Sequence, residues 1–146
     1  MKKCLPLFLG LIGLLVAQNT PTEIYAFSYS QIQTAAQEIL KAMNLKVKSL
    51  ENNVITTELV QTDIATLSEY IQENMPTDRP GWEKGRFYLT LTFNLLNDNQ
   101  TEFIVQAYFE RFGVPYELLL IPPSWRPVPS NGFLEDIILK AVHNKL

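Results

Sequence analysis

The chain contains few side chains that could carry out chemistry. Its only cysteine is Cys4, and its only histidine is His143, which we expect at the surface beside the end of a helix. Catalysis by a Ser-His-Asp or Cys-His set needs a nucleophile beside a base, and a zinc site needs several nitrogen, sulfur or carboxylate ligands. The chain also has no glycine-rich phosphate loop and no dinucleotide-binding fingerprint. The sequence therefore predicts a protein that is not an enzyme, with no catalytic residues, no metal site and no cofactor.

Carboxylates are the remaining candidates for acid–base chemistry. The glutamates expected on strands are Glu58, Glu102, Glu110 and Glu117. Two of them facing each other across a cleft could act as general acid and general base. The alternative is that all four are solvated residues on the outer surface of a sheet. Two of them have a cation opposite in the strand pairings that the sequence predicts, and this favours the second interpretation.

Residues 1–17 have the pattern of a secretory signal peptide. Two lysines give a short positive region, and the residues from Leu5 to Ala17 are almost all apolar. This run has the length of a signal-peptide core and is too short to cross a bilayer comfortably. We expect cleavage after Ala17, with Ala26 as a later candidate and an uncleaved, amphipathic or buried N-terminus as the alternative. The mature protein is then exported, either to the periplasm or out of the cell.

Cysteine position and charge exclude several classes of partner. Cys4 precedes the apolar run, whereas a lipoprotein signal places its cysteine after that run, so we predict no lipid anchor. The net charge is −3, and removal of the two leader lysines leaves 10 basic against 15 acidic residues, or about −5. Nucleic acids and anionic membrane surfaces need clustered positive charge. No second apolar stretch reaches transmembrane length, so we expect no membrane-spanning segment in residues 18–146. We expect these residues to form a single domain. Because nucleic acids and anionic membranes are disfavoured, we expect its partner to be another protein.

The strongest structural signal is a pair of strands, 86–96 and 101–112. Apolar residues alternate along the first strand, which is typical of a strand buried on one face. Pairing residues whose numbers sum to 196 puts apolar residues opposite each other on one face and Arg86 opposite Glu110 on the other. The same register leaves a three-residue loop, Asn97-Asp98-Asn99, in which Asn99 is expected in the left-handed conformation.

The region before this hairpin predicts a strand, a helix and a second hairpin. Residues 22–27 suit an edge strand, and Ser30 with Gln33 suits a capping box at the start of a helix that ends at Asn44. The apolar stripe of this helix is Ile32, Ala35, Ala36, Ile39, Leu40 and Met43. Residues 45–50 and 54–60 then pair with a number sum of 104 around the loop Glu51-Asn52-Asn53.

Two further segments predict connections and a last helix. Residues 61–85 are expected to cross over without clear strands, with a short helix capped by Asp63, and residues 114–121 suit a short strand. The proline-rich run 121–130 is expected to be an extended connection. Ser130 or Asn131 then caps a final helix with acids in its first turn. The apolar stripe of this helix is Leu134, Ile137, Ile138, Ala141 and Val142.

These elements predict an α+β fold in two layers. An antiparallel sheet of four to six strands is expected to carry the N-terminal and C-terminal helices on one face, in a helix-grip-like arrangement. The other face of the central hairpin would then be amphipathic, aromatic and weakly charged. With the two tryptophans, which could anchor a partner or cover the core, it is the candidate interaction surface. Its members are Trp82, Tyr88, Thr90, Thr92, Ile104, Gln106, Tyr108 and Trp125.

Apolar and polar positions also recur along the mature chain in a recognisable order. The segments concerned are 25–30, 35–40, 44–47, 54–57, 85–91, Trp125 and 130–135. This order resembles that of BamC-like domains, which have helix-grip folds and occur in the lipoprotein accessory subunit of the bacterial outer-membrane β-barrel assembly machinery. The resemblance implies an envelope location and a non-catalytic role in contacts between proteins. The chain differs in having no lipidated cysteine in its mature part and one domain where that subunit has two.

Three functions follow as hypotheses. The first is a non-catalytic, exported envelope protein that acts as a protein-binding or assembly-accessory module, and a secreted enzyme inhibitor is a variant of it. The second is a cystatin-like or NTF2-like carrier of a small molecule or lipid. Such a carrier needs an unfilled pocket lined by residues such as Phe93, Val105 and Ile138. The third is a hydrolase with two acids about 5–10 Å apart in a cleft.

Overall fold

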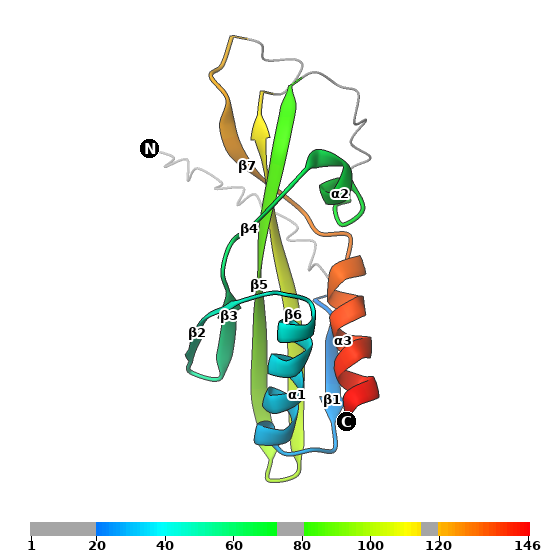
Figure 1. Cartoon of the computed structure of the whole chain (residues 1–146). Coiled ribbons are helices and arrows are strands. Elements are labelled where there is room, and N and C mark those ends of the chain that lie inside the picture. The colour runs from blue at the N-terminus through cyan, green and yellow to red at the C-terminus, as the bar shows by residue number, and fades with distance from the viewer. Residues whose placement is uncertain (1–19, 73–80, 115–119) are drawn as a thin grey trace, which may run out of the picture.

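The computed structural model describes residues 20–72, 81–114 and 120–146, which form three helices and a seven-stranded sheet (Figure 1). The helices are α1 (Tyr29–Ala42), α2 (Ile64–Ser68) and α3 (Phe133–Lys145). The strands are β1 (Thr22–Tyr25), β2 (Val47–Glu51), β3 (Val54–Thr57), β4 (Val60–Thr62), β5 (Trp82–Asn97), β6 (Gln100–Gly113) and β7 (Ser124–Val128).

The predicted α+β class with an antiparallel sheet is confirmed. The strand order is β1-β6-β5-β3-β2, with β4 also pairing with β5 and β7 also pairing with β6. Every pairing is antiparallel. In Figure 1 the long hairpin of β5 and β6 runs the length of the molecule, while α1 and α3 lie along its lower half. The sheet has more strands than predicted because two short segments, β4 and β7, pair with the upper part of this hairpin.

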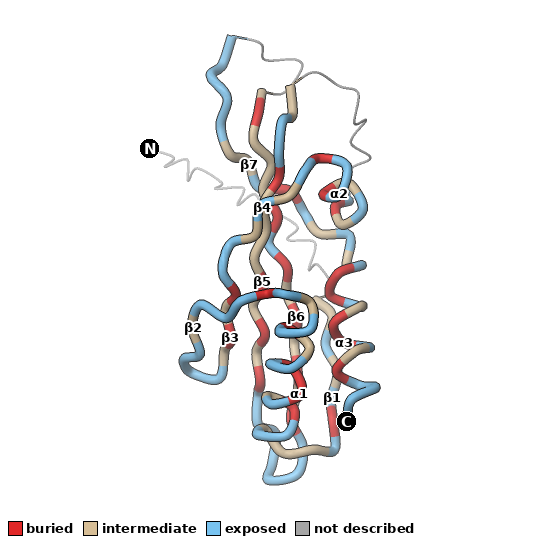
Figure 2. The backbone as a smooth tube through the Cα atoms, in the orientation of Figure 1, coloured by how far each residue is buried: buried red, intermediate tan, exposed pale blue. Residues whose placement is uncertain are grey.

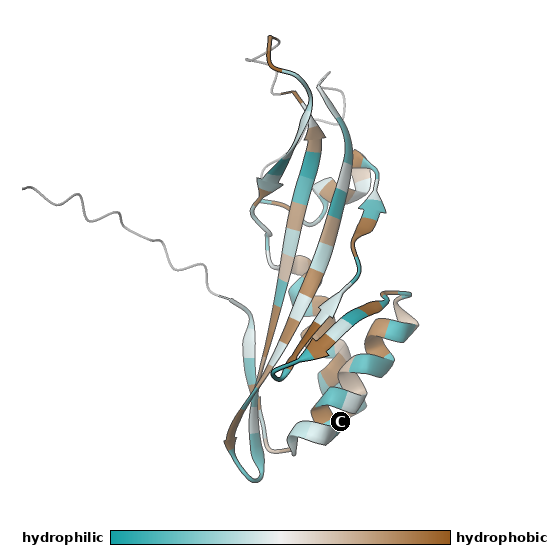
Figure 3. Cartoon of the chain, turned by 90° about the vertical axis from the view of Figure 1, so that its left-hand side faces the viewer, coloured by the Kyte–Doolittle hydropathy of each residue, from teal (hydrophilic) through white to brown (hydrophobic). Residues whose placement is uncertain are grey.

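The two faces of the β5–β6 hairpin differ in burial. Residues with odd numbers lie on the face toward α1 and α3, and Leu91, Phe93, Phe103 and Val105 there are fully buried. The helices contribute Ile32, Leu40, Ile138 and Val142 to the same core. Residues with even numbers lie on the opposite face and stay partly exposed (Figure 2). The alternation of apolar and polar residues along both strands is visible in Figure 3.

The predicted register of this hairpin is confirmed, but its turn is different. Arg86 pairs with Glu110, and the number sum of 196 holds down to the pair of Leu95 with Thr101. The register then shifts, and Asn97 pairs with Gln100. The loop therefore contains two residues, and among the described residues Asn99 is not one of those with a positive φ. The extra residue is taken up as an irregularity beside Leu96 because Asn97 Oδ1 accepts the Asn99 N–H (3.0 Å) and closes the turn locally.

The predicted register of the second hairpin is correct only at its open end. Val47 pairs with Thr57 as expected, but Leu50 pairs with Ile55 and not with Val54. The cause lies in the turn, where Asn52 and Asn53 both have positive φ values, of 51° and 62°. Two consecutive left-handed residues make the two-residue turn that suits the twist of a hairpin, so the third loop residue joins the strand. A bulge after Val47 absorbs the difference.

The first helix begins two residues earlier than predicted. Ser28 is its N-cap, and Gln31 Oε1 accepts hydrogen bonds from the Ser28 N–H (3.1 Å) and the Ser28 hydroxyl (2.8 Å). The sequence offers the same Ser-x-x-Gln spacing at Ser30, but starting at Ser28 adds Tyr29 to the helix. The Tyr29 ring meets Phe93 edge-on at 5.6 Å, so core packing selects the earlier start. The helix stops before Asn44, close to the predicted end, and Asn44 has a positive φ of 58°.

The crossover and the proline-rich segment contain more sheet than predicted. Asp63 caps α2 by accepting the Thr66 N–H at 2.7 Å, as expected, but β4 precedes it and β5 begins already at Trp82. The segment 124–128 is not a simple connection, because it pairs with β6 as β7. Pro127 is tolerated there because β7 is an edge strand in the described sheet. Most of the strand predicted at 114–121 lies outside the described residues, and those described are not in a strand.

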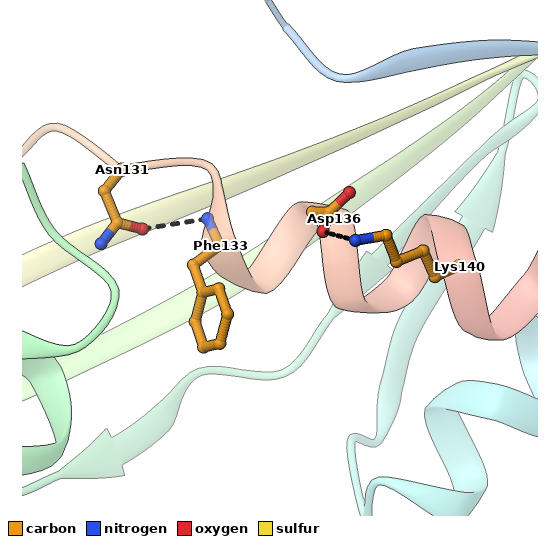
Figure 4. A network of polar contacts seen from close by, with 4 residues as sticks. All are labelled: Asn131, Phe133, Asp136 and Lys140. Atoms are coloured by element: carbon orange, nitrogen blue, oxygen red, sulfur yellow. Dashed lines mark hydrogen bonds and ion pairs between the residues drawn. The ribbon is translucent and has the colours of Figure 1, made fainter.

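The last helix starts after a polar turn and is rotated relative to the prediction. Its N-cap is Gly132, while the Asn131 side chain accepts the Phe133 N–H at 2.9 Å (Figure 4). Asp136 pairs with Lys140 one turn later. The buried residues are Leu134, Glu135, Ile138, Leu139 and Val142, whereas Ile137 and Ala141 are only partly buried. The helix contacts both α1 and β6, so its buried side is wider than one stripe and includes a charged residue.

Candidate functional site

Six of the predicted surface residues lie together on the face of the sheet opposite α1 and α3. We call them the uncovered face: Tyr88, Thr90 and Thr92 on β5, with Tyr108, Gln106 and Ile104 directly opposite on β6. Their sequence spacing of two residues puts them on one side of the strands, and all six keep some solvent exposure. The sequence therefore places this group correctly, because it depends only on strand periodicity and on a register that the structure confirms.

A pair of tyrosines is the most ordered feature of the uncovered face. The rings of Tyr88 and Tyr108 stack with centroids 4.8 Å apart and an interplanar angle of 11°. Tyr108 remains 37% exposed, although each ring covers one face of the other. Burial raises the pKa of the Tyr88 phenol, and the proximity of Tyr108 and Glu110 raises it further. The Tyr88 phenol is therefore protonated at neutral pH, which makes it a hydrogen-bond donor as well as part of an aromatic surface.

Trp125 belongs to the same side of the sheet, above the tyrosine pair. It lies on β7 opposite Phe112, and the two rings have centroids 5.3 Å apart. The Arg86 guanidinium stacks on the Trp125 ring at 3.9 Å and also forms an ion pair with Glu110. Lys84 lies 4.9 Å above the Phe112 ring. The rings of Trp125 and Phe112 thus extend the uncovered face upward, and a cationic side chain lies against each of them.

Trp82 lies on the opposite side of the sheet from the other predicted surface residues. The β5–β6 register shifts between Trp82 and Lys84, so one extra residue turns Trp82 to the side of the core. Its ring is partly buried against the core, and the Arg111 guanidinium stacks on it at 3.9 Å. A bulge of this kind cannot be read from alternation alone, which is why the sequence groups Trp82 with Trp125.

A groove opens where the edge of β6 lacks a strand partner. On this edge β1 pairs with β6 up to Ile104, and β7 pairs with it from Phe109 onward. The Val105 N–H still reaches the Pro21 carbonyl at 3.2 Å, and the next three residues of β6 face an opening between the two edge strands. The groove has a volume of about 920 Å³. It joins the Tyr88 and Tyr108 side of the uncovered face to the start of α3.

Glu135 closes the bottom of this groove. It is only 3% exposed, and its carboxylate accepts the Ala107 N–H at 3.2 Å and the Ser130 hydroxyl at 2.8 Å. The Ser130 oxygen in turn accepts the Gly132 N–H at 3.0 Å. A helix side chain thus takes the place that a neighbouring strand would occupy along β6, and it prevents a buried backbone donor from remaining unpaired.

Sequence reasoning assigns Glu135 only to the helix dipole and misses this role. A signal was present, because Glu135 precedes Ile138, Leu139 and Val142 by three, four and seven residues. That spacing puts it on the same helix face as three apolar residues that the structure buries. A charged residue on an apolar face is a candidate for a buried polar contact.

The other candidates for chemistry are dispersed over the described residues. The His143 side chain is 64% exposed, 4.0 Å from Glu23. Glu58 is exposed, Glu102 accepts a hydrogen bond from Asn94, and Glu110 is paired with Arg86. Glu117 lies outside the described residues. Within the ranges that the structure describes, no group of three or more His, Cys, Asp or Glu side chains could hold a metal ion.

The residues proposed to line a carrier pocket lie in the packed core instead. Phe93, Val105 and Ile138 are each fully buried. The groove beside β6 is not lined by them, and neither is a second hollow of about 740 Å³ at the start of α3. In the part of the chain that the structure describes, none of the helices is both long enough and apolar enough to cross a membrane.

Comparison of the chain with protein-family models, with curated proteins and with solved structures finds no match. The uncovered face and the groove are therefore the features from which a function can be inferred.

Proposed function

We propose that this protein is an exported, non-enzymatic envelope protein that binds another protein through the uncovered face and the adjoining groove. The carrying observation is that one face of the central hairpin is packed under two helices, while the other presents stacked tyrosines, threonines and Trp125 without a covering element among the described residues. Tyrosine, tryptophan and arginine are the side chains most enriched in the energetic centres of protein interfaces.

The composition supports a protein partner over other classes. The mature chain is acidic and has no run of basic residues, which disfavours nucleic acid and anionic membranes. The signal-peptide pattern and the resemblance to BamC-like domains support an envelope location and an assembly-accessory role. A secreted enzyme inhibitor would use the same kind of surface, and identification of the partner separates it from an assembly protein.

The carrier hypothesis receives less support from the side chains. A carrier of this shape would hold its ligand between helices and sheet, where Phe93, Val105 and Ile138 have no exposed surface. Aromatic contacts between Tyr29, Phe93 and Phe103 fill this layer, with ring centroids 5.1–5.6 Å apart. Ligand entry there would require separating packed core side chains, which is costly.

The groove contains two carboxylates, which a hydrolase would also need. Glu110 and Glu135 both line it. Glu110 is held by Arg86 on the sheet surface, however, and Glu135 is held by the Ala107 N–H and the Ser130 hydroxyl. Each carboxylate therefore already has hydrogen-bond donors that hold it in place, which suits a fixed binding group better than a general acid that must exchange a proton with a substrate.

Site-specific photocrosslinking in the native envelope tests the proposal. A photoreactive residue at Thr90 or Gln106 should give one discrete adduct, and the same residue at Lys140, exposed on α3, should give none. Thr90→Arg should abolish the adduct formed from Gln106 because a large cation would be placed in the centre of the interface. Adducts of equal yield from Thr90 and Lys140, or from neither position, would contradict the proposed function.

A further inference from the structure

The carboxylate at the bottom of the groove has no charged partner. Glu135 is 3% exposed, and its two hydrogen-bond donors, the Ala107 N–H and the Ser130 hydroxyl, are both neutral. Among the residues that the structure describes, no lysine, arginine or histidine forms an ion pair with it. A buried carboxylate in a protein is usually balanced by a cation, so Glu135 is an incomplete pair that faces an opening.

The walls of the groove are rich in acceptors and carry one carboxylate, Glu135, without a cation beside it. Glu110, which is paired with Arg86, and Glu135 line it, and none of the described residues that line it is a lysine, arginine or histidine. Three prolines, Pro21, Pro127 and Pro129, also line it and carry no N–H to donate. A group that enters this groove is therefore favoured if it brings positive charge and several donors. A guanidinium has five N–H donors and no acceptor.

An aromatic ring lines the same groove as the carboxylate. Tyr88 on β5 covers one face of the Tyr108 ring on β6, so the other ring face is on the side of the open edge of β6. Both tyrosines line the groove. A planar guanidinium stacks on aromatic faces better than an ammonium does, and it pairs with a carboxylate through two parallel hydrogen bonds.

We propose that the groove binds an arginine side chain of an extended segment of the partner protein, with the guanidinium between the Glu135 carboxylate and the Tyr108 ring. This inference rests on the proposed function, since it names the chemistry that the partner presents to the uncovered face. Between the ends of β1 and β7, β6 has no strand neighbour among the described residues, so an extended segment can cross this gap while its arginine enters between the two strands.

The test uses the exported protein and three short extended peptides of serine, threonine and valine with arginine, citrulline or lysine in the centre. Binding is followed by NMR through the amide signals of Ala107 and Gly132, which flank the Glu135 carboxylate. We expect the arginine peptide to shift these signals and to bind about tenfold more tightly than the citrulline peptide, which has the same shape without the charge. The lysine peptide should be intermediate.

Variants assign the effect to the groove. Glu135→Gln keeps an oxygen for the Ala107 N–H but removes the charge, so the preference for arginine over citrulline should disappear. Tyr108→Leu should weaken arginine binding about threefold to tenfold without affecting Glu135. Glu102 lies on β6, the strand of Tyr108, but outside the groove, so Glu102→Gln should not change the binding of the peptides. If Glu135→Gln fails to fold, the citrulline peptide and Tyr108→Leu still test the inference.

Two outcomes overturn the inference. One is equal binding of the arginine and citrulline peptides, or no shift of the Ala107 signal with any peptide. The other is that Glu102→Gln weakens binding as much as Glu135→Gln does, because the effect would then be general charge. Crosslinking from Thr90 that persists in Glu135→Gln would overturn the arginine site while the proposed function stands. Arginine-dependent binding in a protein that gives no envelope adduct would instead overturn the proposed function.

Discussion

The two faces of the β5–β6 hairpin are made by alternate residues of the same strands, yet they differ in burial. On one face Phe93 and Phe103 stack 5.1 Å apart beneath helices. On the other face Tyr88 and Tyr108 stack 4.8 Å apart, and none of the described helices lies above them. The two aromatic pairs thus have similar geometry, but only the tyrosine pair carries hydroxyl groups, and only the phenylalanine pair is covered by described helices. We therefore expect the first pair to contribute to stability, and we propose that the second pair contributes to recognition.

The largest difference between the faces should appear in stability. Phe103→Ala removes a fully buried ring and should lower the free energy of unfolding by about 3–5 kcal/mol. Ile104→Ala, at the next residue on the uncovered face, should cost about 1 kcal/mol or less. Urea denaturation of both variants measures the contrast. Similar losses for both would mean that the second face is also part of the core.

A smaller loss of stability is expected at Glu135, whose buried carboxylate takes the place of a neighbouring strand beside β6. Glu135→Ala leaves the buried Ala107 N–H without its partner and should cost about 1–3 kcal/mol. Asp136→Ala, one residue along the helix, removes only an exposed pair with Lys140 and should change the unfolding free energy by about 0.5 kcal/mol or less. Equal effects in thermal unfolding would contradict the assigned role of Glu135.

Alkaline pH should weaken the covered side through Tyr25. Burial raises the pKa of Tyr25 above its ordinary value of 10.0, and the hydrogen bond to Glu23 raises it further. Since the folded state keeps the proton more tightly, this contribution is complete below pH 10 and is lost as pH rises above 10. Tyr25→Phe should flatten the fall in stability above pH 10. A pH series of urea midpoints measures this.

The smallest effect concerns the cap of α2. The Thr66 N–H and hydroxyl lower the pKa of the Asp63 carboxyl below its ordinary value of 3.8. The stabilisation is therefore present above pH 3.8 and is lost as pH falls through the lower pKa of the folded state. Asp63→Asn keeps an acceptor for the Thr66 N–H but does not titrate, so it should reduce the acid dependence of stability. An unchanged acid profile would show that the cap contributes nothing measurable.

Sequence periodicity predicts the faces of this protein better than its turns and edges. The sum of 196 follows from alternation along two long strands, and the structure confirms it from Arg86 to Leu95. The predicted length of each turn was wrong by one residue. Asn52 and Asn53 both adopt left-handed conformations, and the Asn97 side chain accepts a hydrogen bond within its own turn, so each loop contains two residues and not three. Such local choices are decided by small energies that a hydrophobic pattern does not contain.

The candidate site likewise contains some residues that the sequence pattern predicts and others that it does not. Six residues of the uncovered face follow from register alone, while Trp82 depends on a bulge and Glu135 depends on where α3 meets β6. The groove exists because β1 ends before β7 begins along one strand edge. That arrangement joins segments more than 80 residues apart, so no local pattern in the sequence reveals it.

Oxidative footprinting of the two tryptophans and the tyrosine pair tests the central claim most directly. Hydroxyl-radical labelling would be compared between the isolated protein and the protein in its native envelope. We expect Tyr108 and Trp125 to be protected severalfold in the envelope, while Trp82, on the other side of the sheet, is labelled equally in both. Unchanged labelling of Tyr108 and Trp125, or protection confined to Trp82, would contradict the claim that the uncovered face is the contact surface.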